Sequence, residues 1–424
     1  MSAPSSTPAP QHVVVVGAGM VGLATAWFLQ ERGVQVTMLE RDHVGAGSSW
    51  GNAGWLTPSI TTPLPEPAVL TYGLRAVLSP SSPVYVPLRP QLKLLRFLAG
   101  FARHSTARRW GVAMRAFAPI NALALDAFDR LEEGGVKAHT HAADPFLACY
   151  RSAEERRVLL DELGHIAAAG QDVKFEAISG EEARAEEPLL SGAVSAALRI
   201  HGQRYLNPPE FVEALAASVR LRGASILTGV GVEQVRDENG GVSVVDSTGA
   251  VHRFDAAVLA NGAWLDDLAK PFGVRRAVQA GRGYSFSVAA EQMPRGPIYF
   301  PAQRVACTPL HSPAGDRLRI AGMMEFRSPS AALDPRRIEA IVDAVGPLLD
   351  SVVLEDRQDE WVGSRPCTAD GLPLVGGTTS GRVFVAGGHG MWGIVLGPVT
   401  GRLLAERIVT GTNAPALTPF DPLR

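Results

Sequence analysis

Apolar residues over the first forty positions follow two different spacings. The run from Val13 to Val16 is uninterrupted and β-branched, which predicts a strand buried on both faces of a parallel sheet. After three closely spaced glycines, Leu23 to Leu29 are apolar on nearly every side, which predicts a helix packed against that sheet. Gly33 stands where a helix C-terminal cap is expected, and residues 34–40 supply the next strand. The chain thus opens as strand, glycine turn, helix and strand.

The rest of the chain divides into helical and extended segments. Residues 91–135 have helical spacing, and capping signals start further helices at Ser152, Ser179 and Asn207. Residues 334–345 and 394–408 predict two later helices. The predicted strands are 225–228, 231–236, 242–246, 256–260 and 383–386, with antiparallel strands over 284–288, 305–310 and 318–323.

The glycines of the first turn have the spacing of a dinucleotide site. Gly17 permits the tight turn, Gly19 lets a pyrophosphate approach the backbone, and Gly22 lets the helix pack closely on the strand. The helix N-terminus offers free N–H groups and a partial positive charge to phosphates. Glu40 ends the next strand, where a carboxylate accepts a hydrogen bond from a ribose hydroxyl. Strand, turn, helix and acid agree, so a dinucleotide site is predicted.

Composition and charge narrow the class of protein. The 424 residues are 46% hydrophobic and 19% charged, as in an ordinary globular protein of two domains. A net charge of −2 predicts no nucleic-acid partner. The three cysteines are far apart, which indicates neither a disulfide framework nor a metal site and favours a reducing cytoplasm. Residues 1–10, rich in Ser, Pro and Ala, predict a disordered tail.

Six motifs in one order resemble the FAD-dependent D-amino-acid oxidase superfamily, and within it the D-amino-acid dehydrogenase branch and the glycine/sarcosine oxidases. They are GAGMVG…LE (17–40), GAGSSWGNAGW (45–55), LANGAW (259–264), GRGYS (281–285), GSRPCTADGLPLVG (363–376) and VAGGHGMWGIVLGPVTGRLLAE (385–406). The resemblance implies an α/β fold: a Rossmann-like FAD-binding domain (GR2-type) with an α+β substrate domain built on an antiparallel sheet. We expect residues 11–85, 200–274 and 352–424 in the FAD-binding domain and 86–199 and 275–351 in the substrate-binding domain.

A second glycine-rich strand end, residues 387–393, suits a flavin, because glycines let the backbone approach a flat ring. The positive end of the helix that follows would stabilise negative charge on reduced flavin. His43 is the kind of residue that attaches flavin covalently in some relatives, with a solvated loop histidine as the alternative. The resemblance and the turn together assign FAD contacts to Gly17, Gly19, Met20, Val21, Gly22, Glu40, Arg41, Ser48, Ser49, Gly51, Asn52, Gly54, Val232, Asn261, Gly262, Gly388, Gly390, Met391, Trp392 and Gly393.

The implied substrate is an amino acid, whose carboxylate must be fixed beside the flavin. A guanidinium is the best clamp, because its fork matches two oxygens. The resemblance puts Arg365 of the GSRP motif in that position, with a structural ion pair as the alternative. Tyr284 and His389 are further candidates for catalysis. Tyr284, Trp392 and Glu325 are candidates for binding the substrate, Glu325 by facing its amine.

The resemblance implies oxidation of the Cα–N bond of a D-amino acid, or a related secondary amine, by hydride transfer to flavin N5. The imine then hydrolyses to a 2-oxo acid and ammonia. Two alternatives remain open: a glycine/sarcosine-type oxidase using oxygen, and a non-catalytic FAD-bearing subunit of a larger complex. The electron acceptor, whether quinone, another carrier or oxygen, is open as well. The basic amphipathic segment 92–103 is either a cover packed over the substrate domain or a peripheral contact with anionic lipid.

Overall fold

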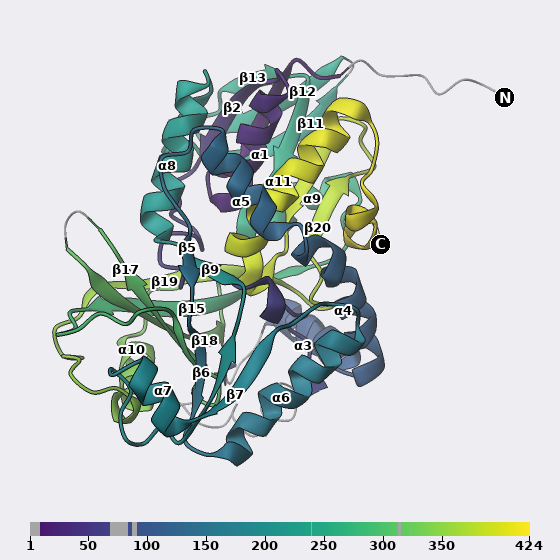
Figure 1. Ribbon diagram of the computed structural model, residues 1–424. Coiled ribbons are helices and arrows are strands. Elements are labelled where there is room, and N and C mark those ends of the chain that lie inside the picture. Colours follow the sequence, from purple (N-terminus) through teal and green to yellow (C-terminus); the bar gives the residue numbers. More distant parts are fainter. Residues whose placement is uncertain (1–8, 68–83, 87–90, 239, 313–314) are drawn as a thin grey trace.

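The computed structural model describes residues 9–67, 84–86, 91–238, 240–312 and 315–424. Figure 1 shows two layered regions, one around the N-terminal strands and α11, the other around a broad sheet flanked by α6, α7 and α10. The tail expected over residues 1–10 falls mostly outside the described residues, which begin at Ala9.

The N-terminal region is built on a six-stranded sheet in the order β10-β2-β1-β14-β21-β20. The parallel strands are β1 (His12–Val16), β2 (Gln35–Glu40), β10 (Ser225–Thr228), β14 (Ala256–Leu259) and β21 (Val383–Gly387); β20 (Leu374–Gly377) pairs antiparallel to β21. The predicted parallel α/β sheet is therefore present, and β10 begins and ends where the sequence indicated.

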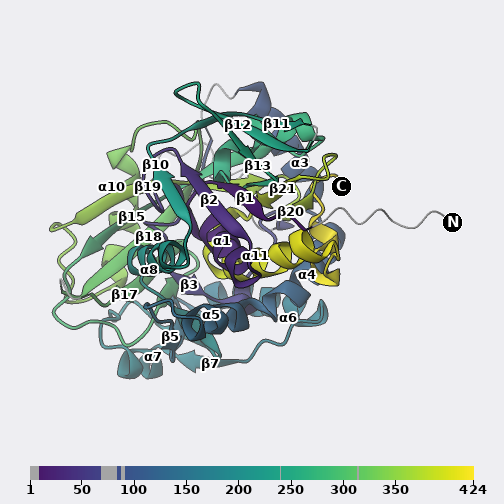
Figure 2. The same cartoon turned by 90° about the horizontal axis from the view of Figure 1, so that it is seen from above.

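Helices cover one face of this sheet and strands cover the other. The helices α1 (Met20–Glu31), α5 (Ala124–Glu133), α8 (Pro208–Leu221) and α11 (Gly393–Thr410) share one apolar core with the sheet, and Figure 2 shows α1 and α11 side by side. A three-stranded sheet of β11 (Val232–Glu238), β12 (Gly241–Asp246) and β13 (Val251–Phe254) packs on the opposite face, together with α9 (Leu265–Ala269).

The second region is a nine-stranded mixed sheet, largely antiparallel. Its main path runs β19 (Gln358–Thr368), β15 (Val278–Val288), β18 (Arg317–Phe326), β17 (Val305–Leu310), β16 (Ile298–Phe300), β6 (Phe146–Tyr150), β8 (Ala196–Ile200) and β7 (Phe175–Ser179), with β4 (Val84–Tyr85) pairing β18. A small sheet joins β3 (Trp55–Leu56), β9 (Gln203–Tyr205) and β5 (His141–Ala143).

The helices of this region agree with the capping signals. Ser152 caps α6 (Ala153–Ala168) and Ser179 forms a complete capping box on α7 (Gly180–Glu186). The stretch expected to be helical contains α3 (Leu92–His104), α4 (Ala107–Asn121) and α5, and α10 (Pro335–Val345) follows its predicted start.

Several strands were missed or shortened in the sequence analysis. The strands β6, β7 and β8 are short and lie among helices, and β19 was treated as a motif rather than a strand. The strand β15 extends beyond the predicted 284–288 at its N-terminal end, and β18 extends beyond 318–323 at both ends, because the added residues pair with neighbouring strands. Pairing across long sequence separations made these segments extended.

Candidate functional site

A cavity opens at the carboxyl ends of the parallel strands, the place where open α/β sheets bind ligands. Val16, Leu39 and Ala386 line it from β1, β2 and β21, and Ala260 lines it from just beyond β14. The predicted cofactor residues that line it are Gly17, Gly19, Met20, Val21, Glu40, Arg41, Ser48, Ser49, Asn52, Val232, Asn261, Gly262, Gly390, Met391 and Gly393. Arg365 and His389 line the same cavity.

The glycine turn is closely packed. Gly17 has φ +104°, and a Cβ there would lie 2.6 Å from the carbonyl oxygen of Ala260. A Cβ on Gly22 would lie 2.0 Å from the carbonyl oxygen of Gly17, so Gly22 serves the packing of α1 on the turn rather than the cavity wall. Gly19 precedes the first turn of α1 and supplies no side-chain cap, which leaves N–H groups of that turn directed at the cavity.

Two side chains fix the backbone around this turn. Ser49 Oγ accepts a hydrogen bond from the Met20 N–H at 3.1 Å. Glu40 accepts from the Ala18 N–H at 2.7 Å through Oε2 and from the Asp42 N–H at 3.0 Å through Oε1. Its carboxylate is therefore held at the cavity edge by backbone donors, where it can also accept from a ribose hydroxyl.

A neighbouring pair extends this wall. The Arg41 guanidinium lies 4.1 Å from the ring centroid of Trp264, and both residues line the cavity. Trp264 belongs to the LANGAW motif but was not chosen as a site residue in the sequence analysis. Other lining residues missed there are Asp42, Gly47, Val230, Gly231, Ala263, Asp267, Leu268, Ser364, Pro366, Gly387 and Ile394. Most of these residues are apolar or small. Their positions near strand ends bring them to the cavity, and the residue type alone does not indicate this.

Two buried polar atoms at the cavity have no partner among the described residues. His389 is 3% exposed, its Nε2 lies 2.9 Å from Thr400 Oγ1, and its Nδ1 has no hydrogen bond. Burial lowers the pKa of His389 to about 4, so the imidazole is neutral near pH 7. Asn261 donates to the carbonyl of Trp264, and its Oδ1 has no partner. Because buried polar atoms are normally hydrogen-bonded, these two indicate a ligand.

Arg365 enters the cavity from β19, on the face of the nine-stranded sheet that we call the near face. Trp361, Gly363 and Arg365 alternate onto this face, and Gly283 of β15 lies opposite Gly363. A Cβ on Gly283 would lie 2.1 Å from Arg365 Nη2, so the glycine makes room for the guanidinium.

The Arg365 guanidinium is only partly bonded to protein. Its Nη1 donates to the carbonyl of Met323 at 2.7 Å, and within the described part of the chain it has no other hydrogen bond and no ion pair. Burial lowers the pKa of Arg365 below its usual high value, and an arginine remains protonated near pH 7. The site thus contains a cation with unpaired N–H groups.

Besides Gly22, four predicted cofactor residues lie outside the cavity lining, namely Gly51, Gly54, Gly388 and Trp392. A Cβ on Gly51 would lie 2.1 Å from the ring of Trp361, and a Cβ on Gly54 would lie 2.2 Å from the carbonyl of Leu206. Gly388 has φ +72° beside Thr368 and Leu374. Trp392 donates from Nε1 to the carbonyl of Thr62 at 2.6 Å. His43 is exposed on its loop and does not line the cavity.

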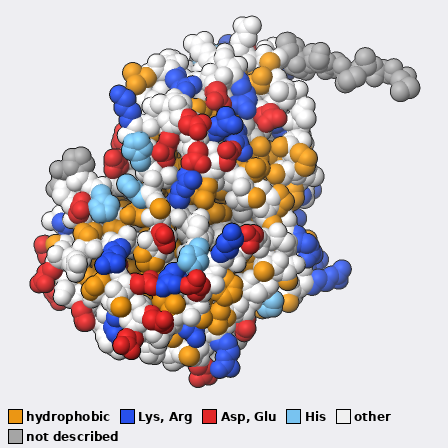
Figure 3. All heavy atoms as spheres, in the orientation of Figure 1, with side chains coloured by type: hydrophobic (Ala, Val, Ile, Leu, Met, Phe, Trp, Pro, Cys, Tyr) orange, Lys and Arg blue, Asp and Glu red, His pale blue; other side chains and the backbone are white. Residues whose placement is uncertain are grey.

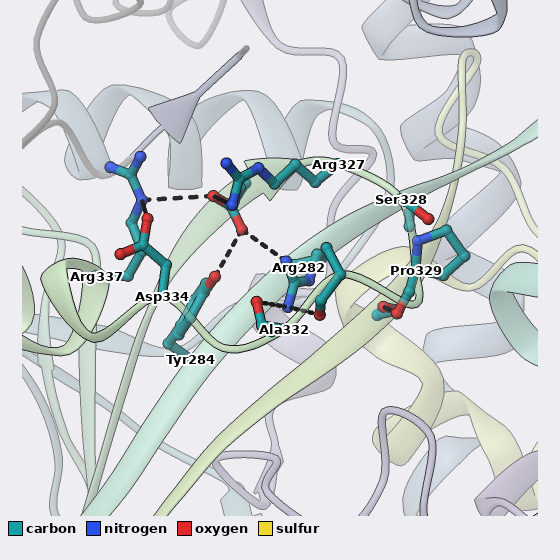
Figure 4. Close-up of polar contacts among 12 residues, drawn as sticks. Arg282, Tyr284, Arg327, Ser328, Pro329, Ala332, Asp334 and Arg337 are labelled. Atoms are coloured by element: carbon teal, nitrogen blue, oxygen red, sulfur yellow. Dashed lines mark hydrogen bonds and ion pairs between the residues drawn. The ribbon is translucent and has the colours of Figure 1, made fainter. Parts of the chain in front are cut away.

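Tyr284 and Glu325 lie on the opposite face of the nine-stranded sheet, which we call the far face. Glu325 is 0% exposed, and its Oε2 accepts from Arg282 Nη1 at 3.1 Å and from the Tyr284 hydroxyl at 2.6 Å. Its Oε1 lies 3.5 Å from Arg337 Nε and 3.6 Å from Arg327 Nη1. Figure 4 shows Arg282, Tyr284, Arg327 and Arg337 converging on one carboxylate. The structure therefore separates Tyr284 and Glu325 from the cavity that holds Arg365 and His389.

Within the described ranges, no group of three or more His, Cys, Asp or Glu side chains is arranged to hold a metal ion. None of the helices in the described ranges is long and apolar enough to cross a bilayer.

Comparison with known proteins agrees with this geometry. The family described as FAD dependent oxidoreductase matches residues 12–407. The chain is 31% identical over 424 residues to a D-amino acid dehydrogenase of Methylobacterium radiotolerans, covering 97% of this chain and 98% of that protein. It is 29% identical over 404 residues to a D-amino acid dehydrogenase of Cereibacter sphaeroides, covering 94% and 91%.

The fold is similar to the solved glycine oxidase of Geobacillus kaustophilus, with a TM-score of 0.73, 24% identity, and 98% and 99% of the two chains covered. The family match spans nearly the whole chain, including the glycine turn and the second glycine-rich strand end. The chain therefore belongs to the FAD-dependent oxidoreductase family and is an enzyme that uses FAD.

Proposed function

We propose that this oxidoreductase oxidises the Cα–N bond of a D-amino acid to an imine, which hydrolyses to a 2-oxo acid and ammonia. The observation that carries the proposal is the position of Arg365. A guanidinium with unpaired N–H groups lines the cavity that also contains the glycine turn and the start of α11. Relatives similar over most of the chain are named D-amino acid dehydrogenase, which supports the substrate class.

The described residues fit FAD. The turn at Gly17 and Gly19 leaves backbone N–H groups for a pyrophosphate, Glu40 stands at the end of β2 for the ribose, and Gly390 and Gly393 open α11 without side chains. When bound, FAD supplies the two-electron acceptor for the hydride that leaves Cα. The orphaned Nδ1 of His389 and Oδ1 of Asn261 are available to it or to the substrate.

The protein's own contribution is to hold and orient the substrate. Arg365 can bind a carboxylate through the N–H groups that Met323 does not occupy, and this fixes the end of the amino acid from which Cα is positioned. His389 is neutral near pH 7, and its Nδ1 is free to form one hydrogen bond with a ligand in the cavity. Desolvation of the ammonium in the cavity favours the neutral amine, and the hydride can then leave from Cα.

Anaerobic mixing of the purified holoenzyme with both enantiomers of an amino-acid panel tests the proposal. We expect D-amino acids to bleach the flavin absorbance and L-enantiomers to leave it unchanged. If no amino acid reduces the flavin, the proposal fails, and a non-catalytic FAD-bearing subunit is favoured. Hydrogen peroxide formed at the rate of dye-linked turnover, with glycine or sarcosine as the best substrate, would replace it with an oxygen-using oxidase.

We propose a division of the chain into an FAD-binding part (11–85, 200–274 and 352–424) and a substrate-binding part (86–199 and 275–351). The six-stranded sheet supports the FAD-binding part, because all of its strands come from those residue ranges: β1, β2, β10, β14, β20 and β21. The strand β19 crosses this division, because it comes from the third FAD-binding segment and lies at the edge of the nine-stranded sheet. In this division Arg365 belongs to the strand that the two parts share.

We also propose that α3 and the start of α4 contact anionic lipid. Residues 67–125 contain eight Lys and Arg and no Asp or Glu. The buried side of α3, formed by Leu94, Phe97 and Phe101, packs on Met324 and Phe326 as a cover, while Leu92 and Leu95 are 62% and 48% exposed beside Arg96 and Arg103. Figure 3 shows basic side chains gathered at the edge where Figure 1 places α3 and α4. Exposed leucines flanked by cations suit a lipid surface.

Sedimentation with vesicles tests the lipid contact. We expect the holoenzyme to sediment with phosphatidylglycerol vesicles at low salt and not at high salt, and the double variant Leu92→Ser, Leu95→Ser to remain in solution. Leu221→Ser, which changes an 84% exposed leucine on α8, is the matched control and should bind as the wild type does. Failure of the wild type to sediment at low salt would remove the contact.

A further inference from the structure

The far-face cluster contacts the same short stretch of β18 that holds Arg365. Glu325 lies directly across from Arg282 in the pairing of β18 with β15, and Tyr284 lies across from Gly322. Between these two pairs, β15 has the single residue Gly283, whereas β18 has Met323 and Met324. The extra residue is a β-bulge, a feature that redirects backbone groups at functional sites.

The bulge puts Met323 in an unusual conformation. Its φ is +67°, in the left-handed region that a non-glycine residue adopts only at some cost. In this conformation its carbonyl oxygen accepts the 2.7 Å hydrogen bond from Arg365 Nη1. The Met323 carbonyl is therefore the only protein acceptor of Arg365 in the described part of the chain. Because the Met323 backbone is strained, other contacts must hold this carbonyl in place.

Glu325 connects the two residues of β15 that flank the bulge. One oxygen, Oε2, accepts from both Arg282 and Tyr284, which lie on either side of Gly283. Arg282 is further tied to the carbonyls of Ala331 and Ala332 at 2.6 and 3.1 Å, and Figure 4 shows this second anchorage. Arg282, Tyr284 and Glu325 are each at most 1% exposed, so these contacts are made without competition from water.

We propose that Tyr284 and Glu325 are positioning residues for Arg365. By tying Arg282 and Tyr284 together across Gly283, Glu325 fixes the bulge at Met323, and the Met323 carbonyl then orients the guanidinium toward the substrate carboxylate. Gly283 is also needed for this orientation, because any Cβ there would displace the Arg365 guanidinium. The inference rests on the proposed role of Arg365 as the carboxylate ligand. It gives the far-face cluster a part in substrate affinity although none of its side chains lines the cavity.

The test uses the holoenzyme and Tyr284→Phe, which removes the hydroxyl that donates to Glu325 and keeps the aromatic ring. We expect the Kd for propionate, an amine-free carboxylate followed by perturbation of the flavin spectrum, to rise roughly three- to tenfold. KM for the best amino acid should rise by a similar factor while kcat stays within about twofold, because hydride transfer itself does not involve Tyr284. Gly283→Ala should weaken propionate binding at least as much.

Tyr150→Phe is the matched control. Tyr150 lies on β6 of the same sheet, is 2% exposed, and its hydroxyl has no hydrogen-bond partner among the described residues. We expect it to leave the propionate Kd unchanged. In the Arg365→Lys background, Tyr284→Phe should have no further effect on the Kd, because the group that it positions is gone.

Two results would overturn the inference. One is a Tyr284→Phe protein whose Tm falls while its propionate Kd is unchanged, which would make the cluster purely structural. The other is an effect of Tyr284→Phe that persists at full size in the Arg365→Lys background. Both differ from failure of the proposed function, in which the wild-type flavin is reduced by no amino acid of the panel.

Discussion

Two arginines on neighbouring strands, the buried Arg282 of β15 and the half-buried Arg365 of β19, have opposite surroundings. Arg282, on the far face, pairs with Glu325 and donates to two backbone carbonyls. Arg365, on the near face, donates to one carbonyl and faces the cavity. A buried cation that is paired with a buried carboxylate serves the fold, whereas a cation without a carboxylate partner beside a cavity is suited to bind an anion. The two faces of one sheet therefore have separate tasks, connected at the Met323 bulge.

Substitution of Arg365 tests the near face and has the largest expected effect. Arg365→Ala removes a desolvated, charge-assisted contact, so KM should rise roughly hundredfold or more. Arg365→Lys keeps the charge but loses the two-pronged guanidinium, so its KM should lie between those of the wild type and Arg365→Ala. The FAD-to-protein ratio and Tm should stay near wild type. An unchanged KM in either variant would contradict the assignment of this face to the substrate.

Substitution of Glu325 tests the far face through stability. Glu325→Ala leaves Arg282 and Arg337 buried without the carboxylate that both approach, and breaking a buried pair in this way costs about 3–5 kcal/mol. Urea unfolding of the holoprotein, followed by circular dichroism, measures the loss. A change below about 1 kcal/mol would show that the cluster does not stabilise the fold as a buried ion network should.

His389 is a cavity-lining group held neutral, in contrast to the charged far-face cluster. Its pKa in the folded state is lowered to about 4, while an ordinary histidine titrates near 6.5. Between these values the unfolded chain binds the extra proton, so stability is fully present above pH 6.5 and falls as the pH drops toward 4. The lost stability is roughly 3 kcal/mol for this shift.

The variant His389→Asn should lose this part of the pH dependence. Urea midpoints at pH 7 and pH 4.5 measure it, and the decisive quantity is the difference between the two midpoints, whatever the stability of the variant at pH 7. A difference as large as that of the wild type would mean that other groups cause the acid sensitivity.

An ion pair with one exposed partner, beside the far-face cluster, should matter least. Arg336 pairs with Asp334 at 2.8 Å; the Arg336 side chain is 77% exposed, whereas that of Asp334 is 9% exposed. Arg336→Ala should leave KM unchanged and lower Tm only slightly, because solvent screens the exposed guanidinium and Asp334 still accepts from the backbone N–H of residue 336. A fall in Tm comparable to that of Glu325→Ala would show that burial is not what separates the two contacts.

The dinucleotide half of the site could be predicted from the sequence because its parts are local. The strand β1, the glycines of its turn and the acid ending β2 lie within thirty residues, and their spacing determines which atoms face the ligand. Gly22 was predicted both to let the helix pack closely and to contact the cofactor; it packs on Gly17 and does not line the cavity. The motif therefore identifies the site, but not every residue of the motif lines the cavity.

The other half depends on pairing between distant segments. Tyr284 lies only one residue from Gly283, which touches Arg365, but alternation along β15 puts its side chain on the opposite face. Glu325 likewise follows the bulge at Met323, which shifts the register of β18 and which no spacing in the sequence indicates. From the sequence, Tyr284 and Glu325 were therefore expected at the substrate site, whereas the fold puts them on the opposite face of the sheet.

By itself the amino-acid sequence determined the family, the cofactor and the identity of the arginine in the cavity, since each follows from short motifs whose chemistry is local. Only the tertiary structure decided which face of the nine-stranded sheet each polar residue occupies, and hence which arginine is neutralised and which is left unpaired. The reason is physical. Strand register and bulges result from packing between segments tens of residues apart, and a one-residue shift moves a side chain from one face to the other.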